Sequence, residues 1–295
     1  MFIQTVTINV ISILKIERRL RMEYFNLNDG NRIPKIGFGT YKLNGSRGVF
    51  AIQAALKNGY RLLDSAVNYE NEGAVGSAIK NSGINRDDIF ITSKLPGRHH
   101  KYQEAIEQIQ ESLYAANLDY YDLYLIHWPN PKENHYLEAW QAMLDAQRFG
   151  LIRSVGVSNF EPSHIEHLYR ETGVMPAVNQ VELHPYWSSK TIREYDDNHN
   201  IITEAWSPLQ RAGEAFKEKE IIDLAQKYHK SPAQIILRWE TQLNVVPIPK
   251  ASSYEHQISN LDIFDFKLTP EEVQKLINLD KISARRFDPN EHEEF

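Results

Sequence analysis

The sequence predicts an α/β fold, a single-domain (β/α)8 barrel of the TIM type with an N-terminal β-hairpin, and two patterns support this prediction. Eight short apolar runs alternate with segments of helical periodicity along the 295 residues, and no Gly-, Ser- or Pro-rich linker divides them. Nearly continuous apolar runs are typical of parallel strands that are covered by helices. Eight strand–helix units suit a closed barrel. An open doubly wound sheet is the alternative, because counting units does not exclude it.

The expected elements follow in chain order. Residues 28–31 form a polar turn that suits the hairpin. The eight strand runs are 35–40, 61–66, 88–95, 121–128, 152–159, 177–183, 201–207 and 244–250. Apolar residues recur with a helical period in 102–118 and 219–229. Two further helices begin with a capping box and a proline at the first helical position, at 231–234 and 269–272.

Composition and charge narrow the class of protein. A hydrophobic fraction of 42%, a charged fraction of 24% and a formal net charge of -6 are ordinary for a soluble globular chain. Because no basic stripe stands out, we expect no nucleic-acid partner. The chain has no cysteine, which excludes disulfides, thiolate metal sites and cysteine nucleophiles. The histidines at 98–100 and 164–167 lack the spacing of a zinc helix, so we predict no metal site.

The first 21 residues are apolar and then basic, whereas a secretory signal begins with its basic part. Their apolar part, of about 13 residues, is too short to span a bilayer. We therefore interpret residues 1–21 as a non-native or disordered extension and residues 22–295 as the barrel. A short membrane-surface helix is the alternative. We expect no membrane partner, and the lack of an export signal points to the cytoplasm.

A dinucleotide-binding Rossmann domain is a second alternative for the start of the chain. Gly37 and Gly39 lie in the first strand run, and Asp64 could act as the ribose-binding acid. The fingerprint requires a third glycine where the helix packs on the strand, and that position is Lys42. Residues 44–46 delay the helix further, so the Rossmann interpretation is rejected.

Polar side chains lie at the ends of three successive strand runs. Asp64 follows the apolar part of the second run, Lys94 ends the third and His127 ends the fourth, with Tyr69 in the loop after the second. In a barrel all four lie at the carboxyl end, where active sites are built. Singly, each has a structural explanation, as a helix cap, a half-buried phenol, a lysine reaching solvent or a core imidazole. Taken together, the four residues are better explained by a shared site than by coincidence.

These four groups permit proton donation to a carbonyl oxygen. A tyrosine with a pKa of about 10 is a poor acid at neutral pH. The ammonium of Lys94 favours phenolate and so lowers that pKa, while Asp64 holds the ammonium in place. Tyr69 can then protonate a developing alkoxide to which His127 donates a hydrogen bond. No G-x-S-x-G elbow or metal cluster supplies a nucleophile, so the chemistry requires a hydride from a cofactor.

At these residues the chain resembles the aldo-keto reductase family, over roughly residues 23–290. Three stretches carry the resemblance: GYRLLDSAVNYENEGAVGSAI at 59–79, IRSVGVSNF at 152–160 and IPKASSYEHQISN at 248–260. The shorter motifs GFGTY, SKL, LIHWP, NQVELHP and EAWSPL add to it. It implies a barrel without a Rossmann domain and a catalytic tetrad of Asp64, Tyr69, Lys94 and His127. The chain is similar to the small prokaryotic branch, with its glyoxal or methylglyoxal and 2,5-diketo-D-gluconic acid reductases.

The resemblance also implies NADPH extended across the top of the barrel. Within the set that it assigns to the cofactor, Gln180 helps to hold the carboxamide, Trp206 stacks on the nicotinamide and Lys250 pairs with the 2′-phosphate. The implied cofactor residues are Thr40, Ser158, Asn159, Gln180, Trp206, Ser207, Leu209, Lys250, His256 and Asn260. Tyr41 and Trp128 are expected to frame an open substrate pocket.

Two positions depart from the pattern of the family. Ala251 stands where serine is usual, and His256 stands where arginine is usual. Arginine stays charged and binds a phosphate bidentately, whereas histidine is largely neutral near pH 7. We therefore expect weaker discrimination between NADPH and NADH.

The expected function is NADPH-dependent reduction of small aldehydes and ketones, including α-dicarbonyls or keto-sugars, by a monomer. One alternative is an NADP(H)-binding sensor or partner protein with little turnover. Another is a hydrolase or isomerase on a barrel, which would need a nucleophile or metal that the sequence does not offer.

Overall fold

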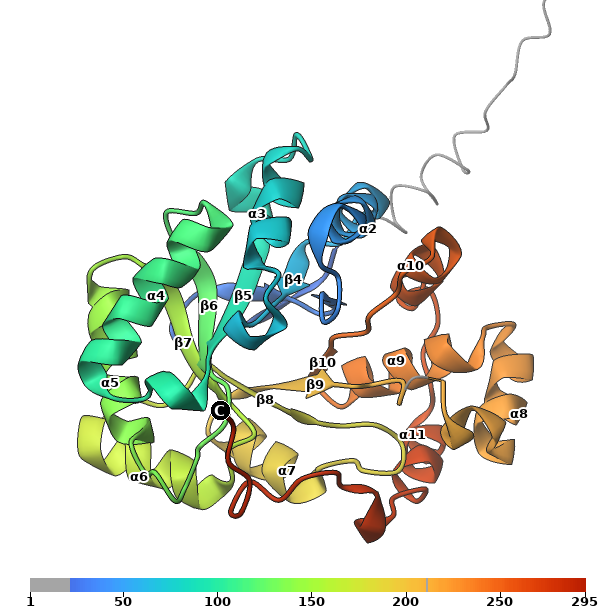
Figure 1. The fold of residues 1–295 in the computed structure, drawn as a ribbon. Coiled ribbons are helices and arrows are strands. Elements are labelled where there is room, and N and C mark those ends of the chain that lie inside the picture. Colours follow the sequence, from blue (N-terminus) through green and yellow to red (C-terminus); the bar gives the residue numbers. More distant parts are fainter. Residues whose placement is uncertain (1–21, 211) are drawn as a thin grey trace, which may run out of the picture.

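Eight parallel strands form one sheet, in a computed structural model that describes residues 22–210 and 212–295 (Figure 1). They pair in chain order, each parallel to the next. The strands are β3 (Phe38–Gly39), β4 (Leu62–Asp64), β5 (Phe90–Leu95), β6 (Tyr121–Ile126), β7 (Ile152–Ser158), β8 (Val178–Glu182), β9 (Ile202–Trp206) and β10 (Val245–Pro247). All eight expected strands are confirmed, and the extension expected at 1–21 lies outside the described residues.

Two glycines close the sheet into a barrel. The N–H of Gly37 donates to the carbonyl of Pro247 over 2.9 Å, and the N–H of Gly39 donates to that of Pro249 over 3.1 Å. A Cβ at Gly37 would lie only 2.5 Å from Ile248 Cδ1 and 2.8 Å from Leu62 Cγ, so a larger residue would displace the apolar side chains packed there. The G-x-G pair therefore serves barrel closure, and the open-sheet alternative is excluded.

The predicted N-terminal hairpin is present and packs against the inside of the barrel. Its antiparallel strands are β1 (Tyr24–Asn26) and β2 (Arg32–Pro34). Leu27 and Ile33 are buried in the same apolar cluster as Leu62 of the barrel wall. The interior of an eight-stranded barrel is filled by side chains. The apolar side chains of the hairpin join this interior, so the hairpin closes one end of the barrel.

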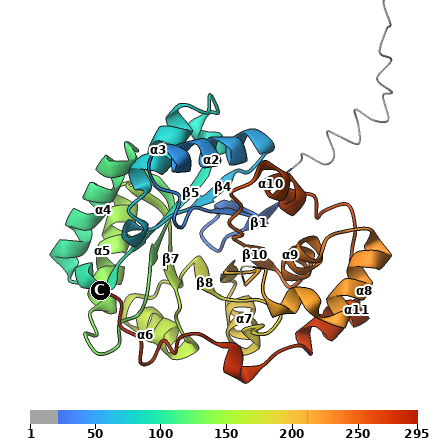
Figure 2. The same ribbon diagram turned by 45° about the vertical axis from the view of Figure 1, so that its right-hand side comes forward.

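Helices surround the barrel, as Figures 1 and 2 show. They are α2 (Gly45–Asn58), α3 (Glu72–Lys80), α4 (Tyr102–Ala116), α5 (Tyr136–Arg148), α6 (Pro162–Thr172), α7 (Lys190–Asn198), α8 (Lys219–Tyr228), α9 (Pro232–Gln242), α10 (Tyr254–Leu261) and α11 (Pro270–Ile277). Short 3-10 helices are η1 (Val67–Tyr69), η2 (Arg86–Asp88), η3 (Gly97–His99), η4 (Glu214–Lys217) and η5 (Ile282–Ala284). Both predicted capping boxes are confirmed, at the starts of α9 and α11. Among the described residues, no helix is long and apolar enough to cross a membrane.

Close packing of α3 against α4 depends on one glycine. A Cβ at Gly76 would lie 1.8 Å from the carbonyl oxygen of Ala116, which belongs to the backbone of α4 and cannot swing aside. At Gly73, on the same helix, the nearest atom to a Cβ would be the carbonyl oxygen of Ala115 at 3.3 Å. A side chain at position 76 would therefore clash with α4, whereas one at position 73 would make only a mild contact, although both glycines lie in α3.

We predict that Gly76→Ala lowers the free energy of unfolding by about 1–3 kcal/mol, because the added methyl group forces the two helices apart. The matched change Gly73→Ala should alter it by less than about 1 kcal/mol, since the gain in helix propensity offsets a mild contact. Chemical denaturation of both variants measures the difference. Equal stability of the two would contradict the packing argument.

Candidate active site

A buried ion pair joins the ends of two neighbouring strands. Asp64 is the last residue of β4, and Lys94 lies near the end of β5. Lys94 Nζ lies 2.7 Å from Asp64 Oδ2 and donates a second hydrogen bond of 2.7 Å to the carbonyl oxygen of Ser65. The lysine side chain has no exposed surface, so these oxygens replace the water that its ammonium loses. The parallel register, which pairs Asp64 with Thr92, places the two side chains together.

Tyr69 lies against this pair, at the end of η1. Lys94 Nζ is 5.0 Å from the centroid of the phenol ring. The rings of Tyr41 and His127 meet that ring edge-on, with centroids 5.0 Å and 6.0 Å away. His127 directly follows the last residue of β6. The four polar side chains noted at the strand ends therefore gather at the carboxyl end of the barrel.

Burial raises the pKa of Tyr69 to about 12, although the Lys94 ammonium lowers it and so offsets part of this effect. The pKa of Lys94 is itself raised: burial opposes its charge, but Asp64 and Tyr69 more than compensate. The lowered pKa expected from the sequence is therefore wrong, because burial outweighs the effect of the Lys94 ammonium. Tyr69 is thus a neutral phenol at neutral pH, a donor that keeps its proton until a strong base appears beside it.

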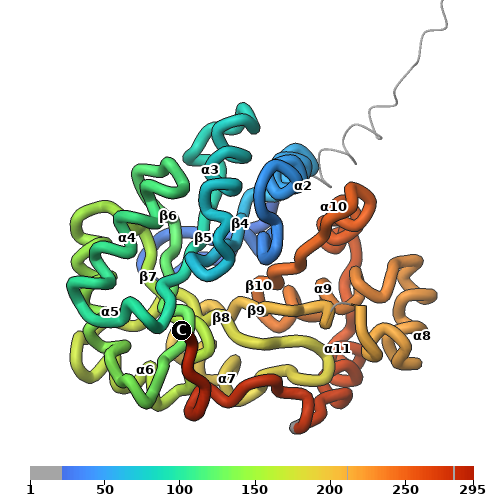
Figure 3. Tube along the Cα trace, viewed as in Figure 1, coloured from blue at the N-terminus to red at the C-terminus, as the bar shows by residue number. Residues whose placement is uncertain are grey.

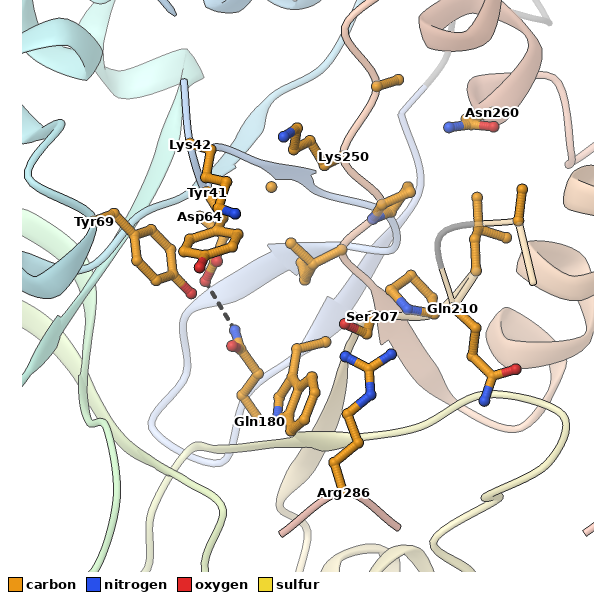
Figure 4. Close-up of a pocket in the computed structure, with 18 of the residues that line it drawn as sticks. Tyr41, Lys42, Asp64, Tyr69, Gln180, Ser207, Gln210, Lys250, Asn260 and Arg286 are labelled. Carbon is orange, nitrogen blue, oxygen red and sulfur yellow. Dashed lines mark hydrogen bonds between the residues drawn. The ribbon is translucent and has the colours of Figure 1, made fainter. Parts of the chain in front are cut away.

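The amide of Gln180 connects the ion pair to a second buried carboxyl group. Its Nε2 donates to Asp64 Oδ2 over 2.8 Å, drawn in Figure 4, and to Glu204 Oε2 over 3.0 Å. Burial, followed by the nearby Asp64, raises the pKa of Glu204 to about 8, so this carboxyl group keeps its proton at neutral pH. With both N–H groups engaged, Gln180 offers its carbonyl oxygen to the cavity that it lines.

Asn159 holds the indole of Trp206 in one orientation. Trp206 Nε1 donates to Asn159 Oδ1 over 2.8 Å, while Asn159 Nδ2 donates to the carbonyl oxygen of His127 over 3.0 Å. Asn159 adopts a positive φ of 63°, a conformation that asparagine tolerates better than most residues. The indole ring is therefore a fixed wall beside the four polar residues.

Two residues that the resemblance assigned to the cofactor, Thr40 and Ser158, do not line the cavity. The buried hydroxyl of Thr40 donates to the carbonyl oxygen of Asp64 over 2.8 Å. The hydroxyl of Ser158 donates to the backbone carbonyl oxygen of Gln180 over 2.8 Å. Both hydroxyl groups thus hold the backbone of residues that line the cavity.

A cavity of about 870 Å³ opens beside these residues, which is large enough for a cofactor together with a small substrate. Most of the residues singled out from the sequence line it. These are Tyr41, Asp64, Tyr69, His127, Trp128, Asn159, Gln180, Trp206, Ser207, Leu209, Lys250, His256 and Asn260.

Several lining residues were missed by sequence reasoning. They include Lys42, Gln210 and Phe216, and also Arg286 and Phe287 from the C-terminal segment. In Figure 4 the Arg286 guanidinium points toward Ser207. The sequence did offer a signal for Arg286. The segment SARRFDP carries a pair of basic residues but follows neither a strand pattern nor a helix pattern. The C-terminal segment thus lines the cavity together with Tyr41 and Trp128.

Comparison with known proteins identifies the chain. Residues 35–281 match the sequence model of the Aldo/keto reductase family. The chain is 47% identical over 269 residues to 2,5-diketo-D-gluconic acid reductase B of Corynebacterium sp., covering 91% of this chain and 97% of that one. It is 43% identical over 266 residues to methylglyoxal reductase DkgA of Escherichia coli K12, covering 90% and 96%.

The fold agrees with this match. The crystal structure of a Bombyx mori aldo-keto reductase in complex with NADP superposes with a TM-score of 0.83 at 34% sequence identity, over 88% of this chain and 93% of that one. The resemblance noted from the sequence motifs is confirmed. The chain belongs to the aldo/keto reductase family and is an NADP-dependent oxidoreductase that acts on carbonyl groups.

Proposed function

We propose that the protein reduces small aldehydes and ketones, including α-dicarbonyls and keto-sugars, with NADPH as hydride donor. The observation that carries the proposal is the neutral Tyr69 phenol beside the buried Lys94–Asp64 pair, at the wall of a cavity. The similarity to proteins named methylglyoxal reductase and 2,5-diketo-D-gluconic acid reductase supports the substrate class.

The residues of the cavity fit a nicotinamide cofactor. The carbonyl oxygen of Gln180 can accept from the carboxamide NH₂, and the fixed indole of Trp206 offers a flat apolar face to the nicotinamide ring. Lys250, His256 and Asn260 lie together in the lining, where a phosphate and an adenine can be bound. When bound, NADPH supplies a hydride to the carbonyl carbon.

The protein's own groups manage the proton. Tyr69 donates its hydroxyl proton to the carbonyl oxygen as negative charge develops there. Lys94 stabilises the phenolate that remains, and Asp64 keeps the ammonium in place. His127 donates a hydrogen bond to the same oxygen and so orients the carbonyl. Because a developing alkoxide is far more basic than water, a phenol with a pKa of about 12 is acidic enough to protonate it.

The phosphate end of the site governs the choice between NADPH and NADH. We assign Lys250 to the 2′-phosphate, with His256 at the position where an arginine would add a bidentate grip. Ala251 contributes no hydroxyl. Discrimination in favour of NADPH therefore rests mainly on one ammonium.

We predict that Tyr69→Phe lowers kcat by about 10²–10⁴-fold, because the ring stays and only the proton donor is lost. Binding of NADPH should persist within a few-fold. The measurements are NADPH oxidation with methylglyoxal and quenching of tryptophan fluorescence by NADPH. Tyr114→Phe, on the exposed face of α4, is the matched control and should keep full activity.

Full turnover by Tyr69→Phe would refute the assigned role of the phenol. A wild-type protein that binds NADPH tightly but reduces no aldehyde, dicarbonyl or keto-sugar would instead favour an NADP(H)-binding sensor.

We predict that Lys250→Met weakens NADPH binding by about 10–100-fold and NADH binding by less than about 3-fold, since a charge-assisted phosphate contact is lost. Lys190→Met, exposed on α7, is the control. His256→Arg should act in the opposite direction and raise the preference for NADPH. Dissociation constants of both cofactors measure the effect, and equal losses for NADPH and NADH would place the 2′-phosphate elsewhere.

A further inference from the structure

The C-terminal tail, defined here as residues 285–295, crosses the mouth of the barrel and reaches the carboxyl ends of β5 and β6 (Figures 1 and 3). It is held along its path. The N–H of Arg286 donates to Glu182 Oε2, at the end of β8, over 2.9 Å. Farther on, the ring of His292 packs against Trp128 with centroids 4.2 Å apart. The tail is thus a docked part of the site.

The backbone of Glu294 is fixed in place by a buried asparagine. Asn130 Nδ2 donates to the carbonyl oxygen of Glu294 over 2.6 Å, and the N–H of Glu294 donates to Asn130 Oδ1 over 3.1 Å. Gly97 makes room for both, since a Cβ there would lie 2.0 Å from Asn130 Nδ2 and 2.5 Å from the Glu294 oxygen. The end of the tail therefore has a built seat.

From this seat the Glu294 carboxylate reaches the active-site histidine. Glu294 Oε1 lies 2.8 Å from His127 Nδ1, and both side chains are 12% exposed. Asn68 Nδ2 donates to the same Oε1 over 2.7 Å, and Asn68 is held in turn by Arg98. We call His127 and Glu294 the tail pair.

The contact bears on which nitrogen of the His127 ring is available to a substrate. Burial alone would raise the pKa of Glu294, but His127 and Asn68 outweigh it and lower that pKa, so the group is a carboxylate at neutral pH. Glu294 Oε1 lies beside Nδ1 without completing an aligned hydrogen bond, so Nε2 is the ring nitrogen left for the cavity that His127 lines. A neutral imidazole has one N–H, whereas the imidazolium donates from both nitrogens.

We propose that Glu294 is a positioning residue that favours the doubly protonated form of His127, so that Nδ1–H faces the carboxylate while Nε2–H faces the carbonyl oxygen. The proposal rests on the reductase function proposed above. An orienting carboxylate fixes a proton on the imidazole nitrogen that faces it, so the other nitrogen also carries a proton only in the imidazolium form. Here the carboxylate comes from the tail, more than 160 residues beyond the histidine in the chain.

Two cations lie near the tail pair: Arg98, which contacts Asn68, and Lys94, which is paired with Asp64. The other titratable groups around it carry little charge. Burial lowers the pKa of His100 to about 4, and burial also lowers the pKa of His292, so both rings are neutral near pH 7. Tyr69 is a neutral phenol. The neighbouring carboxylate of Glu293 accepts from the N–H of Lys132 over 2.8 Å. Glu294 is the carboxylate that contacts the ring.

Titration of the His127 ring by NMR tests the proposal without requiring turnover. The carbon-bound ring proton is assigned by its absence from His127→Gln. Removing the carboxylate in Glu294→Gln should move the midpoint of the titration to lower pH, because a nearby negative charge favours the imidazolium. Glu291→Gln, an exposed residue of the same tail, removes one charge away from the ring and should leave the midpoint unchanged.

Kinetics supply the second readout. The limb of the pH profile of kcat/KM along which reduction declines at high pH should move to lower pH in Glu294→Gln, and Glu294→Asp should restore part of the shift. An unchanged NMR midpoint in a folded Glu294→Gln would overturn the proposal. So would an activity loss that is uniform across pH, which marks a merely structural tail. If the wild-type protein reduces no carbonyl but the midpoint shifts, the tail pair stands and the reductase function fails.

Discussion

The buried contact between Lys94 and Asp64 is the interaction on which the rest of the site depends. An ammonium with no exposed surface is tolerable only when carboxylate and carbonyl oxygens replace its water, as Asp64 and Ser65 do here. Removing one partner of such a pair typically costs about 3–5 kcal/mol, because the other charge is left buried and unpaired. The parallel register of β4 and β5 supplies this geometry, so the charge beside Tyr69 is built into the barrel wall.

The same carboxylate also joins two parts of the site. Asp64 Oδ2 receives both the Lys94 ammonium and the Gln180 amide, and Gln180 is anchored a second time by Glu204. The orientation of the amide is therefore coupled to the group that holds the lysine. At the other side of the cavity, His127 is approached by the tail, so the site is assembled from both ends of the chain.

Much of the fold could be predicted because it follows from local patterns. Apolar runs marked all eight strands, and the capping boxes marked the starts of α9 and α11. The purpose of Gly37 and Gly39 could not be read locally, since the strand they approach lies some 200 residues later. The raised pKa of Tyr69 likewise could not be predicted from the sequence, because burial depends on every element that packs around the phenol.

By itself, the sequence determined the order of strands and helices and placed Asp64, Lys94 and His127 at strand ends, because period and polarity are properties of neighbouring residues. Only the tertiary structure decided which distant groups meet them. Glu204 looked like one polar residue in an apolar run, and Glu294 like one of several acids in a terminal segment. Their contacts arise because closing the barrel and docking the tail bring remote residues within hydrogen-bond distance, which no local pattern records.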